Sequence, residues 1–158
     1  MKLLRRYLAW KVIRLVLVAG VALFALAQAV PYGRSHHNLP VATVIRWDSP
    51  RTEQLARGAC LDCHSNLTAW PWYTNVAPVS WLAQHDVDDG RSSVNLSTLD
   101  LRSARGGEVI GEIAEKVRSG EMPPLQYKLI HSQARLSKVE REQLASGFEK
   151  TLNAMAGR

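Results

Sequence analysis

The chain has 158 residues, of which 46% are hydrophobic and 22% charged, and this length suits one compact domain with an appendage. Such a composition excludes collagen-like and disordered chains, and two cysteines are too few for a disulfide framework. The formal net charge of +6 comes from the N-terminus, because residues 31–158 hold 15 basic and 14 acidic side chains. A nucleic-acid partner is therefore not expected.

The N-terminal segment, residues 1–30, combines basic residues with an apolar run. The run extends from Leu15 to Val30, has Gln28 as its sole polar residue and is closed by Pro31. As a helix this run spans about 24 Å, whereas the hydrocarbon core of a bilayer is about 30 Å thick. A helix that crosses the bilayer must therefore include some residues before Leu15. The favoured interpretation is an uncleaved transmembrane anchor in the bacterial inner membrane; the alternative is a signal peptide cleaved after an A-x-A site, leaving a soluble periplasmic protein. In either case the rest of the chain is exported.

The exported part begins with residues 31–48, which show no sustained periodicity and predict an extended linker. The domain is expected over residues 49–158. Ser49 is a suitable N-cap and Pro50 a suitable first helical residue, so a short helix is predicted that ends at Cys60.

A second helix is predicted from Pro78 to Gly90. Val79 and Leu82 are expected to face inward, and Gly90 is expected to end the helix.

Two further helices have clearer signals. Residues 108–119 carry apolar side chains at helical spacing and are followed by Gly120 as a C-cap. Ser137 and Glu140 form a capping box for a last helix to about residue 154, with an apolar face of Val139, Leu144, Phe148 and Leu152. Because no strand pair or repeat is evident, the predicted fold class is all-α with large loops.

The stretch CLDCH contains Cys60, Cys63 and His64. A redox-active dithiol or a disulfide is one interpretation, but no βαβ pattern surrounds the pair, and a zinc site lacks further ligands at suitable spacing. C-x-x-C-H is the sequence of covalent haem c attachment: the cysteines form thioethers with two vinyl groups, and the histidine ligates the iron. This interpretation is favoured and predicts one haem c in a small cytochrome c-like helical domain.

The second iron ligand is predicted to be Met122, which follows a helix stop in the stretch GEMPP. A thioether binds iron weakly and needs a rigid backbone, which the two prolines supply. His85 and His131 are the alternative donors.

Aromatic residues are dense just after the attachment motif, and some are expected to line the haem pocket or to donate an indole N–H to a propionate. Arg91 is a candidate partner for a propionate. The tentative pocket residues are Trp70, Trp72, Tyr73 and Trp81.

The exported chain resembles the haem-binding domain family of small membrane-anchored bacterial monohaem cytochromes c. The matching stretches are VPYGRSHHNLPV, CLDCHSNLTAWPWYTNVAPVSWLAQHDVDDGR, GEMPPLQY and HSQARLSKVERE. The resemblance implies thioethers at Cys60 and Cys63, ligation by His64 and Met122, and an uncleaved anchor. Leu99 and Phe148 depart from the family pattern, in which aromatic residues are expected, and they affect packing only.

The expected function is one-electron transfer in the periplasm with redox partner proteins there or in the inner membrane, and no enzymatic activity is expected. The alternatives are a haem-based sensor that binds a ligand after Met122 dissociates, and a periplasmic thiol oxidoreductase that uses Cys60 and Cys63.

Overall fold

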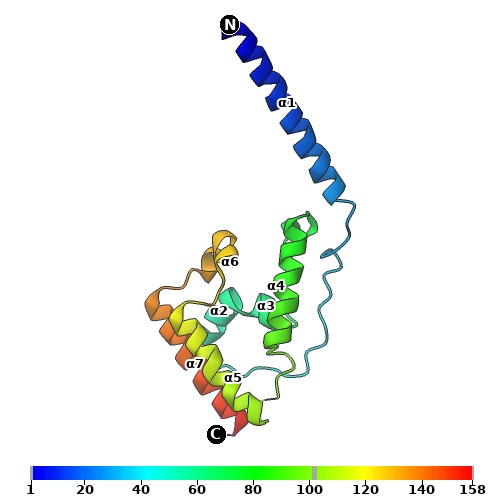
Figure 1. Ribbon diagram of the computed structural model, residues 1–158. Helices are drawn as coiled ribbons and strands as arrows, with labels where there is room; N and C mark the ends of the chain where they lie inside the picture. The colour runs from blue at the N-terminus through cyan, green and yellow to red at the C-terminus, as the bar shows by residue number, and fades with distance from the viewer. Residues whose placement is uncertain (1, 101–102, 158) are drawn as a thin grey trace. The chain divides into compact units, whose positions relative to one another are not determined.

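The computed structural model describes residues 2–100 and 103–157. Over these residues the backbone forms seven α-helices and two 3-10 turns and contains no strand, so the all-α prediction is confirmed (Figure 1). The elements are α1 (Lys2–Ala27), α2 (Pro50–Ala59), α3 (Leu61–His64), η1 (Trp72–Asn75), α4 (Val79–Ser93), α5 (Ala104–Ser119), α6 (Leu125–Ile130), η2 (Ser132–Ala134) and α7 (Lys138–Ala156).

The chain divides into two compact units. The first comprises Met1–His36 with Trp70–His85, and the second comprises His37–Ala69 with Asp86–Arg158. Helix α4 therefore contributes its first half to one unit and its second half to the other. The domain boundaries expected near residues 30 and 48 stay a prediction.

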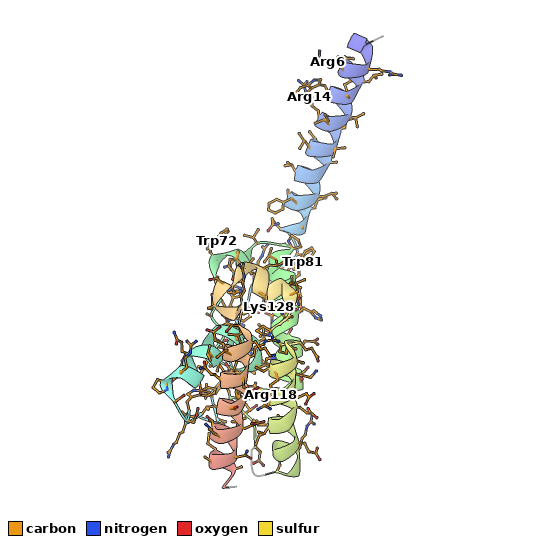
Figure 2. All side chains as sticks on the ribbon, turned by 90° about the vertical axis from the view of Figure 1, so that its left-hand side faces the viewer. Arg6, Arg14, Trp72, Trp81, Arg118 and Lys128 are labelled. Carbon is orange, nitrogen blue, oxygen red and sulfur yellow. The ribbon has the colours of Figure 1, made fainter. Side chains whose placement is uncertain are left out.

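Helix α1 dominates the first unit. Its segment Arg5–Ala27 is long and apolar enough to cross a membrane, with a mean hydropathy of 2.0, and a signal sequence would have the same properties. Every side chain from position 5 to position 26 is exposed, and Figure 2 shows them around the whole circumference of the helix. A helix that is apolar all round and unburied lacks the single apolar stripe of a helix packed on a soluble core.

The core of the second unit forms where α5 and α7 pack side by side and α2 packs on α7 (Figure 1). Gly147 permits the second contact, because a Cβ at that position would collide with the Thr52 side chain. Residues that share this core are Leu55, Ala56, Leu61, Leu96, Ile110, Val117, Leu144, Phe148 and Leu152.

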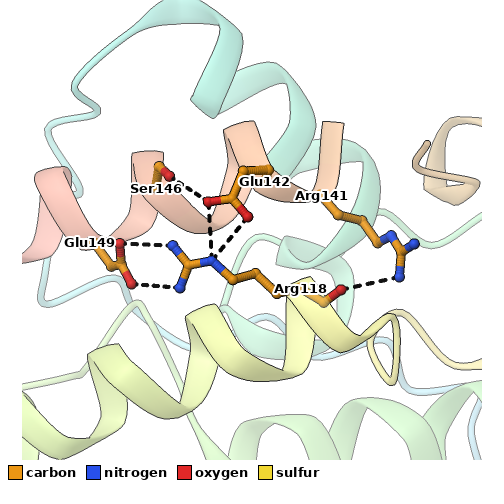
Figure 3. A network of polar contacts seen from close by, with 5 residues as sticks. All are labelled: Arg118, Arg141, Glu142, Ser146 and Glu149. Carbon is orange, nitrogen blue, oxygen red and sulfur yellow. Dashed lines mark hydrogen bonds and ion pairs between the residues drawn. The ribbon is translucent and has the colours of Figure 1, made fainter. Parts of the chain in front are cut away.

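Ion pairs join α5 to α7 at the surface. Arg118 donates to Glu149 at 2.8 and 3.0 Å and to Glu142 at 3.1 Å, while Arg141 donates to the Arg118 carbonyl oxygen at 3.2 Å (Figure 3). The outer edge of the helix pair is therefore polar and its inner face apolar.

Three of the predicted helix ends are confirmed. Ser49 accepts a hydrogen bond from the Thr52 N–H, and the capping box of Ser137 and Glu140 is complete. Gly120 ends α5 with a φ of 80°, a conformation that costs glycine little.

Some sequence expectations about the helices are wrong. Gly90 does not end its helix, because α4 continues to Ser93, and α5 begins at Ala104 rather than at residue 108. Val79, Leu82 and Val139, which were expected to face inward, are 38%, 46% and 66% exposed, and helical spacing alone did not fix the register of the buried face. Helix α6 was not anticipated.

Residues 37–48 lack regular structure, as expected of a linker, yet they belong to the second unit and pack on its core. Trp47 lies edge-on to Phe148 with ring centroids 5.6 Å apart, and the Thr43 N–H donates to the Ser97 carbonyl oxygen at 2.7 Å. The Asp48 N–H donates to Thr151 Oγ1 at 2.9 Å. These contacts satisfy backbone groups that a free linker would leave to water.

Candidate functional site

Cys60 and Cys63 lie on one helical turn. Cys60 ends α2, and its carbonyl oxygen accepts hydrogen bonds from the N–H groups of Cys63 at 3.2 Å and His64 at 2.9 Å. Residues three apart on a turn project from the same side. Both thiols are free and half-buried, so the pair forms no disulfide.

The surroundings of both thiols raise their pKa values. Burial raises the pKa of Cys60 to about 12, with a smaller contribution from Cys63. The pKa of Cys63 also rises to about 12, first through burial and then through the carboxylates of Asp86 and Asp62. A catalytic dithiol works through a thiolate with a lowered pKa, so these surroundings disfavour the thiol oxidoreductase interpretation.

His64 is oriented by the backbone. Its Nδ1 lies 3.1 Å from the Val94 carbonyl oxygen, and its own carbonyl oxygen accepts the Leu96 N–H at 2.8 Å. A carbonyl oxygen only accepts, so Nδ1 carries a proton, and in the neutral imidazole Nε2 then keeps its lone pair. This is the tautomer that a histidine ligand needs when it binds a metal through Nε2.

Gly90 sets the distance between α4 and the cysteine turn. A Cβ at this position would lie 2.5 Å from the Cys63 carbonyl oxygen and 2.9 Å from its Cβ. Only glycine lets the two backbones approach this closely, which explains a glycine inside a helix where it otherwise costs stability.

Two adjoining cavities, of about 150 Å³ and about 280 Å³, lie beside the motif and share four lining residues: Cys60, His64, Ser93 and Met122. The smaller has an apolar wall of Val94, Leu96, Ile113, Val117 and Phe148. The larger is more polar, with Asp62, Asp86, Asp89, Gln126 and Tyr127. The apolar wall of the smaller cavity, which Glu112 and Lys116 also line, suits the hydrophobic face of a porphyrin. The aspartates of the larger cavity would repel its propionates, so they are not the propionate partners.

Met122 reaches these cavities from the end of α5. After Gly120 turns the chain, the Met122 N–H donates to the Lys116 carbonyl oxygen at 3.1 Å, which fixes the backbone that carries the thioether. The fold thus brings together Cys60, Cys63, His64 and Met122, a donor set of the type that holds haem c.

The alternative iron ligands differ in their surroundings. His131 Nδ1 hydrogen-bonds the Tyr127 carbonyl oxygen at 3.1 Å, and its ring stacks on Tyr127 with centroids 3.9 Å apart. His85 is exposed and belongs to the first unit.

The four aromatic residues proposed for the pocket all belong to the first unit, whereas both cavities are lined by residues of the second. Trp81 Nε1 is buried and has no hydrogen-bond partner among the residues described, and its pocket role stays a prediction. For Trp70, Trp72 and Tyr73 the pocket role stays a prediction.

Arg91 has structural partners. It donates to the carbonyl oxygens of Ser65 and His37, and to the side chains of Asn38 and Thr68, at 2.9 to 3.1 Å. These bonds hold residues 37–38 and the segment after the motif together. Binding of a propionate by Arg91 remains a prediction.

Sequence reasoning missed a contact across the larger cavity. Tyr127 Oη donates to Asp62 Oδ2 at 2.7 Å, and Asp62 Oδ1 accepts the Ala69 N–H at 2.9 Å. The bond joins α6, which follows Met122, to the cysteine turn. An acid between the two cysteines and a tyrosine near the MPP stretch were the available signals, although neither indicated the other.

Comparison with known proteins agrees with the geometry. A family model described as a haem-binding domain matches residues 22–150, a span that includes both cysteines, His64 and Met122. No curated protein and no solved structure matches the chain. The matched span covers most of the chain, and the chain therefore belongs to the haem-binding domain family.

Proposed function

We propose that the protein binds one haem c covalently through Cys60 and Cys63 and carries single electrons in the periplasm while anchored to the inner membrane by α1. The observation that carries the proposal is the arrangement of His64 and Met122 on the walls of the same cavities, with His64 Nδ1 bonded to the Val94 carbonyl oxygen. Bound iron supplies the exchange of one electron between its ferric and ferrous states.

Each residue of the site has a separate task in this proposal. Cys60 and Cys63 hold the cofactor as thioethers. His64 ligates through Nε2, and the Val94 carbonyl oxygen keeps the ring oriented and raises its basicity. Met122 would supply the second protein ligand to the iron, which would favour a positive reduction potential and leave no open position for a substrate. A carrier fits this arrangement better than an enzyme or a ligand-binding sensor.

The membrane anchor adds to this function. Arg5, Arg6, Lys11 and Arg14 favour retention of the N-terminus in the cytoplasm, so the haem domain is in the periplasm. Tethering raises the effective concentration of the carrier near membrane-bound redox partners without any new contact.

The test is spectroscopic. The full chain is expressed with a haem maturation system, and the pyridine haemochrome spectrum is recorded for the parent and for a double variant, Cys60→Ala with Cys63→Ala. We expect the band position of two thioethers in the parent and no covalent haem in the variant. A parent protein that carries no covalent haem overturns the proposal.

Ligation by Met122 is tested with Met122→Ala against Met155→Ala, which deletes a thioether that contacts the Arg46 N–H instead. We expect Met122→Ala alone to lose the weak far-red charge-transfer band of an iron–thioether bond, to lower the potential and to bind carbon monoxide in the ferrous state. If the parent binds carbon monoxide equally well, the sensor interpretation replaces the carrier.

A further inference from the structure

The sequence between Asp62 and Asp86 contains no Asp, Glu, Lys or Arg, although 22% of the chain is charged. The same stretch contains three of the five tryptophans, Trp70, Trp72 and Trp81. Its larger part, Trp70–His85, belongs to the first unit, together with α1. Tryptophan is enriched at membrane–water interfaces, and a segment without Asp, Glu, Lys or Arg has no such charge to desolvate there.

Apolar side chains of this segment are exposed. Trp72 is 78% exposed, although tryptophan is highly buried on average, and its ring is contacted edge-on by Tyr73 at 6.0 Å. Val79 and Leu82 are exposed as well. Scattered exposed apolar side chains are ordinary in soluble proteins. They indicate a membrane contact only if the segment that carries them is held close to the end of α1.

The segment is fixed to the end of α1. Gln28, the first residue after the helix, donates from Nε2 to the Ala77 carbonyl oxygen at 2.9 Å and accepts the Ala77 N–H at Oε1 at 3.1 Å. Arg34 donates to the same Oε1 at 3.0 Å. These bonds join the segment to the residues at which the apolar helix ends.

A second contact reinforces this link. Gly33 has a φ of 79° and is buried so close to α4 that a Cβ would collide with the Ser80 carbonyl oxygen. The loop that leaves α1 is therefore packed against the segment at two points, Ala77 and Ser80. If α1 crosses the bilayer, its C-terminal end lies in the headgroup region, and so do residues bonded to it.

We propose that Trp70–His85 lies in the interfacial layer of the lipid bilayer, with Trp72 and Leu82 in contact with phospholipid. The inference rests on the uncleaved anchor of the proposed function. A tryptophan ring there places its apolar body among upper acyl chains and its N–H among headgroups, and the segment has no charged side chain to desolvate. The anchor thus has two parts, a spanning helix and a periplasmic interfacial segment.

The experiment uses the full-length haem protein with 5-fluorotryptophan in lipid nanodiscs. The five ¹⁹F signals are assigned with single Trp→Phe variants. Signal intensity is compared with and without a lipid that carries a nitroxide at the top of its acyl chain, and the ratio cancels the constant contribution of the haem. Trp10, within α1, is the reference for a side chain of the anchor.

We expect the lipid nitroxide to broaden both Trp10 and Trp72, and a water-soluble gadolinium chelate to broaden Trp72 only weakly. If Trp10 is broadened and Trp72 is not, the interfacial segment is wrong and the anchor stands. If neither is broadened, the anchor itself fails. If Trp72 is shielded from both probes, a protein surface covers it and lipid does not.

The link through Gln28 is tested in the same assay. Gln28→Leu keeps the side-chain size and removes both bonds to Ala77, so it should reduce lipid broadening at Trp72 and leave Trp10 unchanged. Gln143→Leu, at an exposed position of α7, is the matched control and should change neither signal. Unchanged broadening at Trp72 in Gln28→Leu would contradict the role given to this link.

Discussion

Two helices of this protein are rich in apolar residues, but those of α1 are exposed and those of α7 are largely buried. In α1 every side chain from position 5 to position 26 is exposed, whereas in α7 Leu144, Phe148 and Leu152 are at most 1% exposed. Apolar residues surround α1 but form a stripe along α7, whose other face carries charged and polar residues. The distribution of apolar residues around a helix therefore decides whether a protein core or a bilayer is its partner.

Charge distinguishes the segment Trp70–His85 from the helix pair α5 and α7 in the same way. The segment Trp70–His85 has no Asp, Glu, Lys or Arg, whereas α5 and α7 are joined at their surface by Arg118, Glu142 and Glu149 (Figure 3). Exposed ion pairs cost little where water solvates both partners, and they would be costly in a lipid interface.

The largest difference is expected between equivalent truncations in the two helices. Phe148→Ala should lower the free energy of unfolding of the haem domain by about 3–5 kcal/mol, because it leaves a cavity at the centre of the core. Leu17→Ala, at a position 63% exposed in α1, should leave that free energy unchanged. Urea denaturation in detergent, followed by the haem absorbance, measures both. Similar losses from the two truncations would show that α1 is part of the domain's core.

A smaller effect is expected where a helix approaches the cysteine turn. Gly90→Ala should destabilise the domain by about 1–3 kcal/mol, because the added methyl group collides with the Cys63 backbone. Gly111→Ala is the matched control: it is exposed in α5 with no atom near its Cβ position, and it should stabilise by roughly 0.5–1 kcal/mol. The denaturation midpoint should fall in Gly90→Ala and rise in Gly111→Ala. If both midpoints change in the same direction, Gly90 is not required for the close approach of the backbones.

The Tyr127 bond gives a prediction about ligand exchange. Tyr127→Phe removes the 2.7 Å hydrogen bond to Asp62, worth about 1 kcal/mol, and loosens the segment after Met122. Imidazole should then displace Met122 with an affinity raised about fivefold, the factor that corresponds to about 1 kcal/mol. Titration of the ferric protein measures this, with Tyr32→Phe in the first unit as the control. An unchanged affinity indicates that the bond does not restrain Met122.

The smallest effect concerns pH. The hydrogen bonds from Arg118 lower the pKa of Glu149 below its ordinary value of 4.5. A lowered folded-state pKa means that the pairing stabilises fully above about pH 4.5 and that its contribution is lost as pH falls through the lowered value. Arg118→Gln should remove this dependence and change stability at neutral pH only slightly, because water screens the exposed pair. The free energy of unfolding, measured between pH 3 and 7 with Arg105→Gln as the control, checks this prediction. If that free energy changes with pH equally in parent and variant, the prediction is contradicted.

Local signals predicted much of the fold. Ser49, Gly120 and the pair Ser137–Glu140 were predicted as helix ends and are helix ends, since a cap is formed by residues at most a few positions apart. The same locality misled elsewhere. A glycine at position 90 is typical of a helix stop. Here the missing Cβ instead lets α4 approach the backbone of Cys63, which is far away in the sequence.

By itself the sequence determined the elements whose causes are local: an apolar N-terminal helix, the capped helices, and a C-x-x-C-H turn that presents two thiols and an imidazole. Only the tertiary structure decided what surrounds that turn. The Val94 carbonyl oxygen selects the tautomer of His64, Met122 reaches the same cavities, and Asp62 meets Tyr127. These contacts join residues 30 or more positions apart, and such pairs form only when packing of the core brings their backbones together.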